Sequence, residues 1–484
     1  MLLLLATVVL ICIIWEVLRF YRRAASLPPG TFAIPILGNF INDIRPPYLA
    51  LGLRTISKKH GNVSTVHMPF PVVNIADFET MRDAFRGPDV TGRMRNIVIE
   101  TTHFLENGGI ISSDGADWSE QRKFAIAVLK DFGMGKNLME EKIREQAQCM
   151  VDFIGRQDLN DVDVRWPINV FVANMINELL FGVTYPFDDC AKLVDFSLAL
   201  TDWIESTSES KLLAIIVMIP WIRHLPIINR FWEKQRKGVD KWLGYVKEAA
   251  AEVHFDPTEE PTCYVQAFRK SSKDPRPEQM LTCCTDLFMA GMETTTTTMR
   301  WAMLYLAAHQ KVQDKLRAEI EEHVERGDVV RMSDKPKMPY SSAVLNEIQR
   351  CANIISPNML IFHRTTVDTE IGGFKIPADT LVNGDIHQLL RTDPIFEQPG
   401  RFWPERYLTE DGKTLRKDVV ERSIFFGIGK RQCAGEALAR AELFIAMVTL
   451  VQNFRIHPVS PIDFEPIYAT VHFPKPQNFR LERI

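Results

Sequence analysis

The chain has 484 residues, of which 46% are hydrophobic and 24% are charged. This composition supports a large buried core, and the formal net charge of −4 argues against nucleic acid as a partner. The eight cysteines are irregularly spread and include no C-x-x-C pair, so neither a zinc site nor a disulfide framework is predicted. Because no Gly/Ser linker, repeat or low-complexity tract divides the chain, we expect one large domain.

The N-terminus is an almost unbroken apolar run that ends at Trp15 and is followed by Arg22 and Arg23. A membrane-spanning helix needs about 20 apolar residues, so the run is marginal for this role. A cleaved signal peptide is the alternative, but its positive charges would precede the apolar run. The sequence favours an uncleaved anchor with the rest of the chain on the cytosolic side. We predict an anchor over residues 1–21, a basic and proline-rich hinge over residues 22–38, and the main domain over residues 39–484.

Hydrophobic periodicity predicts a mainly α-helical domain with small β-sheets, an α+β class. The predicted helices cover residues 48–60, 77–85, 138–153, 167–181, 231–253, 277–309 and 436–450. The predicted strands cover residues 62–67, 72–76, 371–376 and 380–383. A long polar loop over residues 91–115 separates two helices, and long ordered loops in compact domains are commonly functional.

The segment 211–229 is very apolar, yet it is too short and too interrupted by proline to span a bilayer. Two interpretations stay open. The segment either enters the membrane surface or lines a substrate entrance, or it is buried in the core of the domain.

The stretch from Phe426 to Gly435 predicts a metal-binding loop directly before a helix. A thiol is a good iron ligand only as thiolate, and two neighbours of Cys433 favour this form: the guanidinium of Arg431 and the N-terminus of the following helix. Gly429 and Gly435 allow a left-handed turn and the close approach of a flat ligand. Phe426 would shield the sulfur. The pattern therefore indicates a planar iron cofactor held by Cys433.

This stretch has the form Phe-x-x-Gly-x-Arg-x-Cys-x-Gly, and with it the chain resembles the cytochrome P450 family of haem-thiolate monooxygenases, closest to the animal microsomal type. The resemblance implies that haem b lies between the cysteine loop and the long helix predicted over residues 277–309. It also implies that Trp118 and Arg122, four residues apart on one helix, hold a haem propionate. His363 occupies the position from which related enzymes reach a propionate, and Arg431 is expected to reach the second one.

The long helix contains Ala290-Gly291-Met292-Glu293-Thr294 and then four further threonines. Glycine followed by β-branched residues predicts a local distortion of the helix. The resemblance to the family implies that Glu293 and Thr294 are the acid and the alcohol that supply protons on the oxygen-binding side of the haem. Ala290 is small and would leave room above the iron plane.

Glu347 and Arg350 lie three residues apart, on one helix face, and Arg406 follows downstream. Most such pairs are solvated. The match to the family's Glu-x-x-Arg instead predicts a structural, buried ion cluster in which bidentate pairing to Arg406 satisfies the charges.

The resemblance implies a monooxygenase that inserts one oxygen atom from O2 into a lipophilic substrate such as a xenobiotic, a fatty acid or a steroid-like molecule. No flavin or dinucleotide fold is evident, so electrons would come from NADPH through NADPH-cytochrome P450 reductase, with cytochrome b5 as a further candidate partner. Basic contacts for the reductase are predicted at Arg122, Lys123, Lys130 and Lys430. The implied location is the endoplasmic reticulum membrane. The alternatives are a haem-thiolate isomerase and a non-catalytic haem-binding protein.

Overall fold

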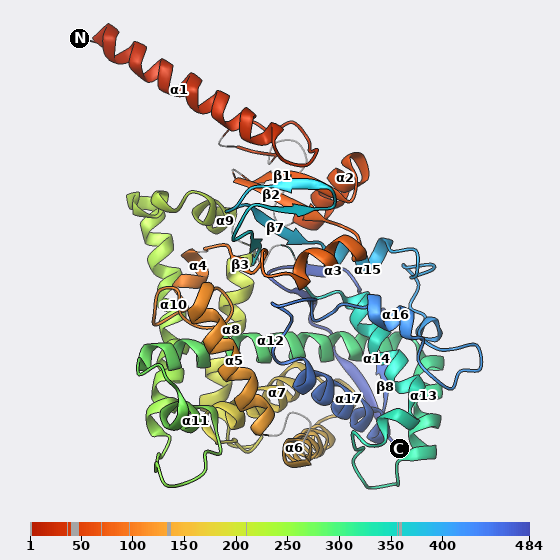
Figure 1. Ribbon diagram of the computed structural model, residues 1–484. Helices are drawn as coiled ribbons and strands as arrows, with labels where there is room; N and C mark the ends of the chain where they lie inside the picture. Colours follow the sequence, from red (N-terminus) through yellow and green to blue (C-terminus); the bar gives the residue numbers. More distant parts are fainter. Residues whose placement is uncertain are drawn as a thin grey trace.

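The computed structural model describes residues 2–35, 37–39, 48–68, 70–95, 97–132, 137–209, 211–355, 357 and 361–484. Helices dominate this part of the chain, and the largest of the small sheets lies at one side of them (Figure 1). The α-helices are α1 (Leu2–Ala25), α2 (Leu49–His60), α3 (Phe78–Arg86), α4 (Ile97–Glu100), α5 (Gly115–Asp131), α6 (Asn137–Gly155), α7 (Arg165–Phe181), α8 (Ala191–Glu209), α9 (Lys211–Met218), α10 (Pro226–Glu252), α11 (Tyr264–Ser271), α12 (Pro277–Ala308), α13 (Gln310–His323), α14 (Pro339–Ala352), α15 (Ile386–Thr392), α16 (Lys417–Arg422) and α17 (Glu436–Asn453).

The largest sheet joins strands that are far apart in the sequence. Its order is β1-β2-β7-β4-β3, with β2 and β7 parallel and the other pairs antiparallel. The strands are β1 (Val63–Met68), β2 (Phe70–Ile75), β3 (Gly92–Arg93), β4 (His363–Arg364), β5 (Thr369–Ile371), β6 (Phe374–Ile376), β7 (Leu381–Gly384), β8 (Phe454–Pro458), β9 (Pro466–Tyr468), β10 (His472–Pro474) and β11 (Phe479–Arg483). The β1–β2 hairpin confirms the predicted strand pair, and the α+β class is confirmed.

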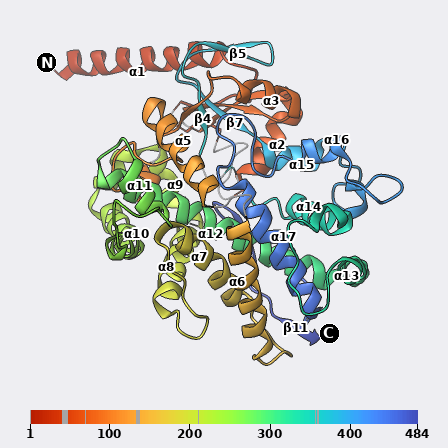
Figure 2. The same cartoon turned by 60° about the horizontal axis from the view of Figure 1, so that its bottom comes forward.

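Helix α12 crosses the middle of the molecule, with the five-stranded sheet on one side and α6, α7 and α17 on the other (Figure 1, Figure 2). Pro277 occupies its first turn, where a missing N–H removes no helical hydrogen bond. Its 32 residues make a rod about 48 Å long at 1.5 Å per residue. Most of its side chains are buried, so the helix is part of the core and fixes the position of whatever lies against it.

Helix α12 is continuous from Pro277 to Ala308, so its threonine run does not interrupt the helix. The Thr294 hydroxyl donates to the Ala290 carbonyl at 2.7 Å, and the Thr298 hydroxyl donates to the Thr294 carbonyl at 2.8 Å. Bonds from a threonine hydroxyl to the carbonyl four residues earlier often bend a helix. The local distortion expected at the threonine run therefore stays a prediction.

Helix α1 extends away from the body of the molecule (Figure 1). It continues to Ala25, so Arg22 and Arg23 lie in its last turn and not in the predicted hinge. Most of its apolar side chains whose burial is described are exposed, for example Leu4 at 73% and Trp15 at 57%. A search of the described residues finds no helix that combines the length and the apolar character needed to cross a membrane. Where α1 meets the body, the Phe20 ring lies 5.2 Å from the ring of His67 on β1.

The apolar segment 211–229 is partly buried and partly exposed, so each of the two interpretations applies to some of its residues. Leu213, Ile216 and Ile222 are buried in a small cluster with Trp232 of α10. By contrast, Trp221 is 65% exposed and Ile227 is 87% exposed. The segment is therefore core on one side and an apolar surface on the other.

The ion cluster around Glu347 is buried as predicted. Arg350 pairs with both oxygens of Glu347, at 2.8 Å from Nε and 2.9 Å from Nη2, and Arg406 Nε donates at 3.1 Å. The three side chains are 0–2% exposed. We expected Arg406 to form the bidentate pair with Glu347, but Arg350 forms it. The remaining N–H groups of Arg406 donate instead to the carbonyls of Glu397, Gln398 and Arg401. One carboxylate thus joins α14 to the segment before the cysteine loop.

Replacing Arg350 with Ala leaves Glu347 buried with one of its two cations. We expect the free energy of unfolding to fall by about 3–5 kcal/mol and haem content to fall with it. Thermal unfolding and the ratio of haem to protein measure both effects. Arg416→Ala is the control, because it removes an exposed ion pair with Asp418 and should change stability by less than about 1 kcal/mol. Unchanged stability and full haem content in Arg350→Ala would contradict a structural role.

Candidate active site

The cysteine loop takes its shape from two glycines in left-handed geometry, Gly427 (φ 76°) and Gly429 (φ 83°). A Cβ on Gly429 would lie 2.0 Å from the Phe85 carbonyl oxygen, so the loop packs directly on the end of α3. The Cys433 N–H donates to the Phe426 carbonyl at 2.9 Å and closes the turn. Gly435 was expected to be left-handed, but its φ is −94° and it is the N-cap of α17. No atom lies within 4 Å of a Cβ built there, so Gly435 leaves open space beside the thiol.

The thiol of Cys433 faces a cavity of about 560 Å³ between the cysteine loop and α12. From α12, the lining includes Ala290, Glu293 and Thr294. From the cysteine loop, the lining includes Phe426, Cys433 and Gly435. The geometry thus brings together two groups of predicted residues that are more than 130 positions apart in the sequence.

Burial raises the pKa of the Cys433 thiol in the protein alone. The Gly435 backbone N–H, Arg122 and Arg440 act in the opposite direction, and Glu436 adds to the increase. The expectation that Arg431 favours the thiolate is therefore wrong: its guanidinium is directed elsewhere. The helix N-terminus does contribute as predicted, through the Gly435 N–H. Bound iron would itself favour the thiolate, because a metal ion deprotonates a coordinating thiol.

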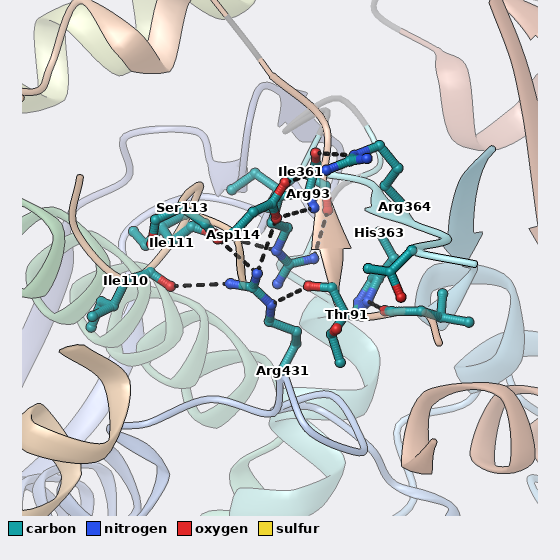
Figure 3. Close-up of polar contacts among 12 residues, drawn as sticks. Thr91, Arg93, Ile110, Ile111, Ser113, Asp114, Ile361, His363, Arg364 and Arg431 are labelled. Atoms are coloured by element: carbon teal, nitrogen blue, oxygen red, sulfur yellow. Dashed lines mark hydrogen bonds and ion pairs between the residues drawn. The ribbon is translucent and has the colours of Figure 1, made fainter. Parts of the chain in front are cut away.

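Arg431 extends from the cysteine loop into a cluster of polar groups at one end of the cavity (Figure 3). It donates to the carbonyls of Thr91 and Ser113, both at 2.7 Å, and Nη2 lies 3.3 Å from the Asp114 carboxylate. Its guanidinium carbon is 3.6 Å from the centre of the Trp118 ring. Burial, and then the neighbouring cation Arg93, lower the pKa of Arg431 to about 8. A buried cation with this pKa lacks sufficient compensating negative charge.

Asp114 also accepts hydrogen bonds from two further arginines, Arg93 and Arg364. None of these three residues was predicted from the sequence to belong to the site. Arg364 Nη2 donates to Asp114 Oδ2 at 2.5 Å, and the Arg93 backbone N–H donates to Oδ1 at 2.6 Å (Figure 3). The Arg93 side chain donates to the carbonyls of Ile111 and Ile361, both at 3.2 Å. Burial lowers the pKa of Arg93 to about 10. Asp114 stands at the N-cap of α5 but makes no capping bond, because its oxygens accept from arginines.

His363 borders the cavity from β4, and its Nδ1 lies 3.0 Å from the Val90 carbonyl. Its ring stacks on Phe85 at 4.1 Å, and burial, followed by the nearby cations Arg93 and Arg431, lowers its pKa. Phe85 therefore supports both His363 and Gly429. The imidazole is held neutral and oriented by its surroundings.

Trp118 and Arg122 lie on one face of α5, as their spacing predicts, but they meet different groups. Arg122 borders the cavity and donates to the Gln432 carbonyl next to Cys433. Trp118 lies against Arg431, and its buried indole N–H has no hydrogen-bond partner. An unpaired buried donor costs free energy and indicates a site for an acceptor.

The Glu293 carboxyl is 2% exposed and is held by two hydroxyl groups on the α12 side of the cavity. Thr201 of α8 donates to its Oε2 at 2.8 Å, and Thr297 donates to Oε1 at 3.3 Å. Thr294, the next residue, borders the cavity with its hydroxyl on the Ala290 carbonyl. The acid and the alcohol are therefore adjacent, with Thr294 nearer to the open space.

Two comparisons with known proteins place the chain in a family. Residues 28–483 match the family model described as Cytochrome P450. The chain belongs to the cytochrome P450 family. Cytochrome P450 2J2 of Homo sapiens is 32% identical over 451 residues, which cover 90% of this chain and 87% of the relative. Cytochrome P450 2J3 of Rattus norvegicus is 32% identical with the same coverage, and cytochrome P450 2C2 of Oryctolagus cuniculus is 30% identical over 454 residues.

As a cytochrome P450, the protein is an oxidoreductase of the monooxygenase type that uses haem b with a cysteine thiolate ligand. The residues at the cavity fit this group on three independent features. Cys433 supplies the thiol, and Gly435 leaves room beside it. Arg93 and Arg431 border the cavity, and the unpaired indole N–H of Trp118 lies against Arg431, so these groups would provide buried donors for the acidic side chains of haem. The assignment of single residues to each propionate stays a prediction.

The cytochrome P450 cavity also contains an acid that the sequence analysis missed. Glu442 of α17 is 1% exposed, its Oε1 has no hydrogen-bond partner, and burial raises its pKa to about 8. A carboxyl in this environment is protonated near neutral pH and carries no charge. Its position directly before the apolar run 443–448 was the available signal, but the sequence cannot show which groups surround it.

Proposed function

We propose that this cytochrome P450 inserts one oxygen atom from O2 into a lipophilic organic substrate, with electrons from NADPH delivered by a flavoprotein reductase. The observation that carries the proposal is that Cys433 and the Glu293–Thr294 pair line one cavity. Much of the remaining lining is aliphatic, for example Ile110, Leu213 and Val217, which supports a lipophilic substrate.

When bound, haem with a thiolate ligand supplies the electron density that favours cleavage of the O–O bond. The chain's own residues supply position and protons. Arg431, Arg93 and Trp118 would hold and orient the acidic edge of the cofactor. Thr294 Oγ donates and accepts hydrogen bonds at the cavity surface, and the Glu293 carboxyl lies one residue away, shielded from bulk water, where it would pass protons toward Thr294.

Reduction with dithionite in the presence of carbon monoxide tests the ligand. Wild-type protein should show the strongly red-shifted Soret band of thiolate ligation, and Cys433→Ser should lose it, because a hydroxyl does not replace a thiolate. Cys149→Ser, at an exposed cysteine of α6, is the control and should keep the band. A folded, haem-loaded wild-type protein without this band would exclude Cys433 as the ligand, and the monooxygenase proposal would fail with it.

Electron supply by NADPH-cytochrome P450 reductase, with cytochrome b5 as a second donor, is supported by exposed cations near the cysteine loop. Lys123 and Lys130 lie on α5, and Lys430 lies on the loop itself, and all three are exposed. An acidic partner would dock there with strong salt dependence. A haem-thiolate isomerase or a haem carrier would need no such donor.

Thr294→Ala should separate electron consumption from product formation in the reconstituted system. We expect NADPH use to continue, product to fall by about 10-fold or more, and hydrogen peroxide to rise, because proton supply at Thr294 Oγ is lost. Thr298→Ala, one turn along the same helix, is the matched control. Equal loss in both variants would contradict a special role for Thr294. Complete absence of NADPH-dependent turnover in wild type, with any of a broad set of lipophilic compounds, would favour the isomerase or carrier alternatives.

We further propose attachment to the endoplasmic reticulum membrane through α1 and the exposed apolar residues near α9. Two contacts support a common surface: Phe20 of α1 packs near His67 of β1, and Val217 of α9 packs with residues of β1 and β2. Both apolar segments therefore lie against the same hairpin. Insertion of exposed apolar side chains into a lipid surface is favourable in proportion to their buried area.

Removal of residues 2–25 should reduce flotation with phosphatidylcholine vesicles strongly but not completely. The double variant Trp221→Ser, Ile227→Ser in the shortened chain should remove the remaining binding, because both side chains are exposed. Val367→Ser together with Val459→Ser, two exposed residues on other loops, is the control. Undiminished flotation of the shortened chain would exclude α1 as the anchor.

A further inference from the structure

A second acidic residue of α12, Asp286, lies eight positions before Thr294 and is fully enclosed. Its Oδ1 is 2.9 Å from His103 Nε2, and the two side chains are 0% and 1% exposed. Its Oδ2 accepts from the backbone N–H groups of Ile110 at 2.7 Å and Ile111 at 2.9 Å. Three donors from one loop thus occupy both oxygens of this carboxylate.

The same loop, residues 102–113, is fitted closely to α12 around this contact. Thr282, one turn before Asp286, accepts from the Phe104 N–H at 3.2 Å. Gly109 has a φ of 76°, and a Cβ there would lie 2.2 Å from Asp286 Oδ2. The loop therefore approaches the carboxylate as closely as a backbone without a side chain allows.

The enclosure of Asp286 determines what the cavity presents to a substrate. Asp286 borders the cavity, but Ile110 and Ile111, which its Oδ2 holds, contribute aliphatic side chains to the lining. The adjoining lining is also aliphatic and includes Val98, Ile99, Leu213 and Val217. The other acid that α12 contributes, Glu293, is held by Thr201 and Thr297. A carboxylate that would otherwise attract cations is thus covered by apolar surface.

We propose that His103 is a positioning residue that makes this site selective for neutral, predominantly aliphatic substrates. By occupying Asp286 Oδ1 and holding the loop closed, His103 prevents the carboxylate from binding an ammonium group. Loss of this donor would leave a buried oxygen unpaired, and a cationic ligand would then satisfy it. The inference rests on the proposed function, because it concerns ligands of the same cavity.

Spectral titration of the haem-loaded protein with two matched probes tests this inference. Decanol is the neutral probe, and decyltrimethylammonium is the cationic one, whose quaternary nitrogen has no lone pair and does not ligate iron. Wild-type protein should bind decanol at least about 10-fold more tightly, because a cation in the aliphatic cavity loses hydration without gaining a partner. The spin-state change of the Soret band reports binding without any need for turnover.

His103→Leu should raise the affinity for decyltrimethylammonium by about 10-fold or more, because one oxygen of Asp286 becomes available. His103→Gln keeps an N–H donor and should behave like wild type. In His103→Leu, Asp286→Asn, the gained affinity for the cation should disappear, because the charge is gone. This rescue and this reversal distinguish the proposal from a general loosening of the loop.

An unchanged preference for decanol in folded His103→Leu would overturn the proposal, as would wild-type protein that binds the cation as tightly as the alcohol. If His103→Leu does not fold, the wild-type preference and the His103→Gln titration decide. The carbon monoxide spectrum of each sample separates the two levels of inference. A normal thiolate band with the wrong ligand preference contradicts only the role of His103, whereas a missing band contradicts the proposed function.

Discussion

Buried positive charge without equivalent negative charge is the constraint on which this site depends. Arg93, Arg364 and Arg431 gather around a single carboxylate, Asp114, and burial lowers the pKa of Arg431 to about 8. Enclosing a cation without a partner costs several kcal/mol. An acidic cofactor edge would supply the missing charge, so we expect binding of haem and stability of this part of the fold to be coupled.

The Glu347 cluster handles the same problem differently. There the two cations, Arg350 and Arg406, direct their remaining N–H groups to backbone carbonyls, and the three side chains are 0–2% exposed. That cluster is satisfied within the protein, whereas the cluster at Asp114 borders an open cavity. The contrast separates a structural use of arginine from a binding use, although both begin with the same residue types.

Sequence reasoning succeeded where one short segment contains the whole signal. The cysteine loop and the α12 boundaries follow from the residues of one segment each, and the Glu293–Thr294 pair follows from the family resemblance. The structure places both the loop and the pair in the lining of one cavity. Sequence reasoning failed where partners are distant. Asp114 meets Arg431 across 317 positions, and His103 meets Asp286 across 183. The orientation of Arg431 was also predicted wrongly. Its guanidinium was expected to favour the Cys433 thiolate, but it lies beside Asp114. The backbone conformation of the loop glycines was predicted only in part. Gly429 has a positive φ as expected, but the second glycine with a positive φ is Gly427 and not Gly435.

The close packing of Gly429 on the Phe85 carbonyl has a consequence for biosynthesis. Phe85 emerges from the ribosome early, together with Arg93, Asp114 and Trp118, whereas the cysteine loop is translated near the end of the chain. Arg93 and the surface of α3 must therefore stay without their final partners during most of synthesis. Closure of the site is a late, post-translational event, and cofactor capture competes at that moment with aggregation and degradation of a nearly complete chain. Cofactor supply thus acts on the yield of this protein as well as on its activity.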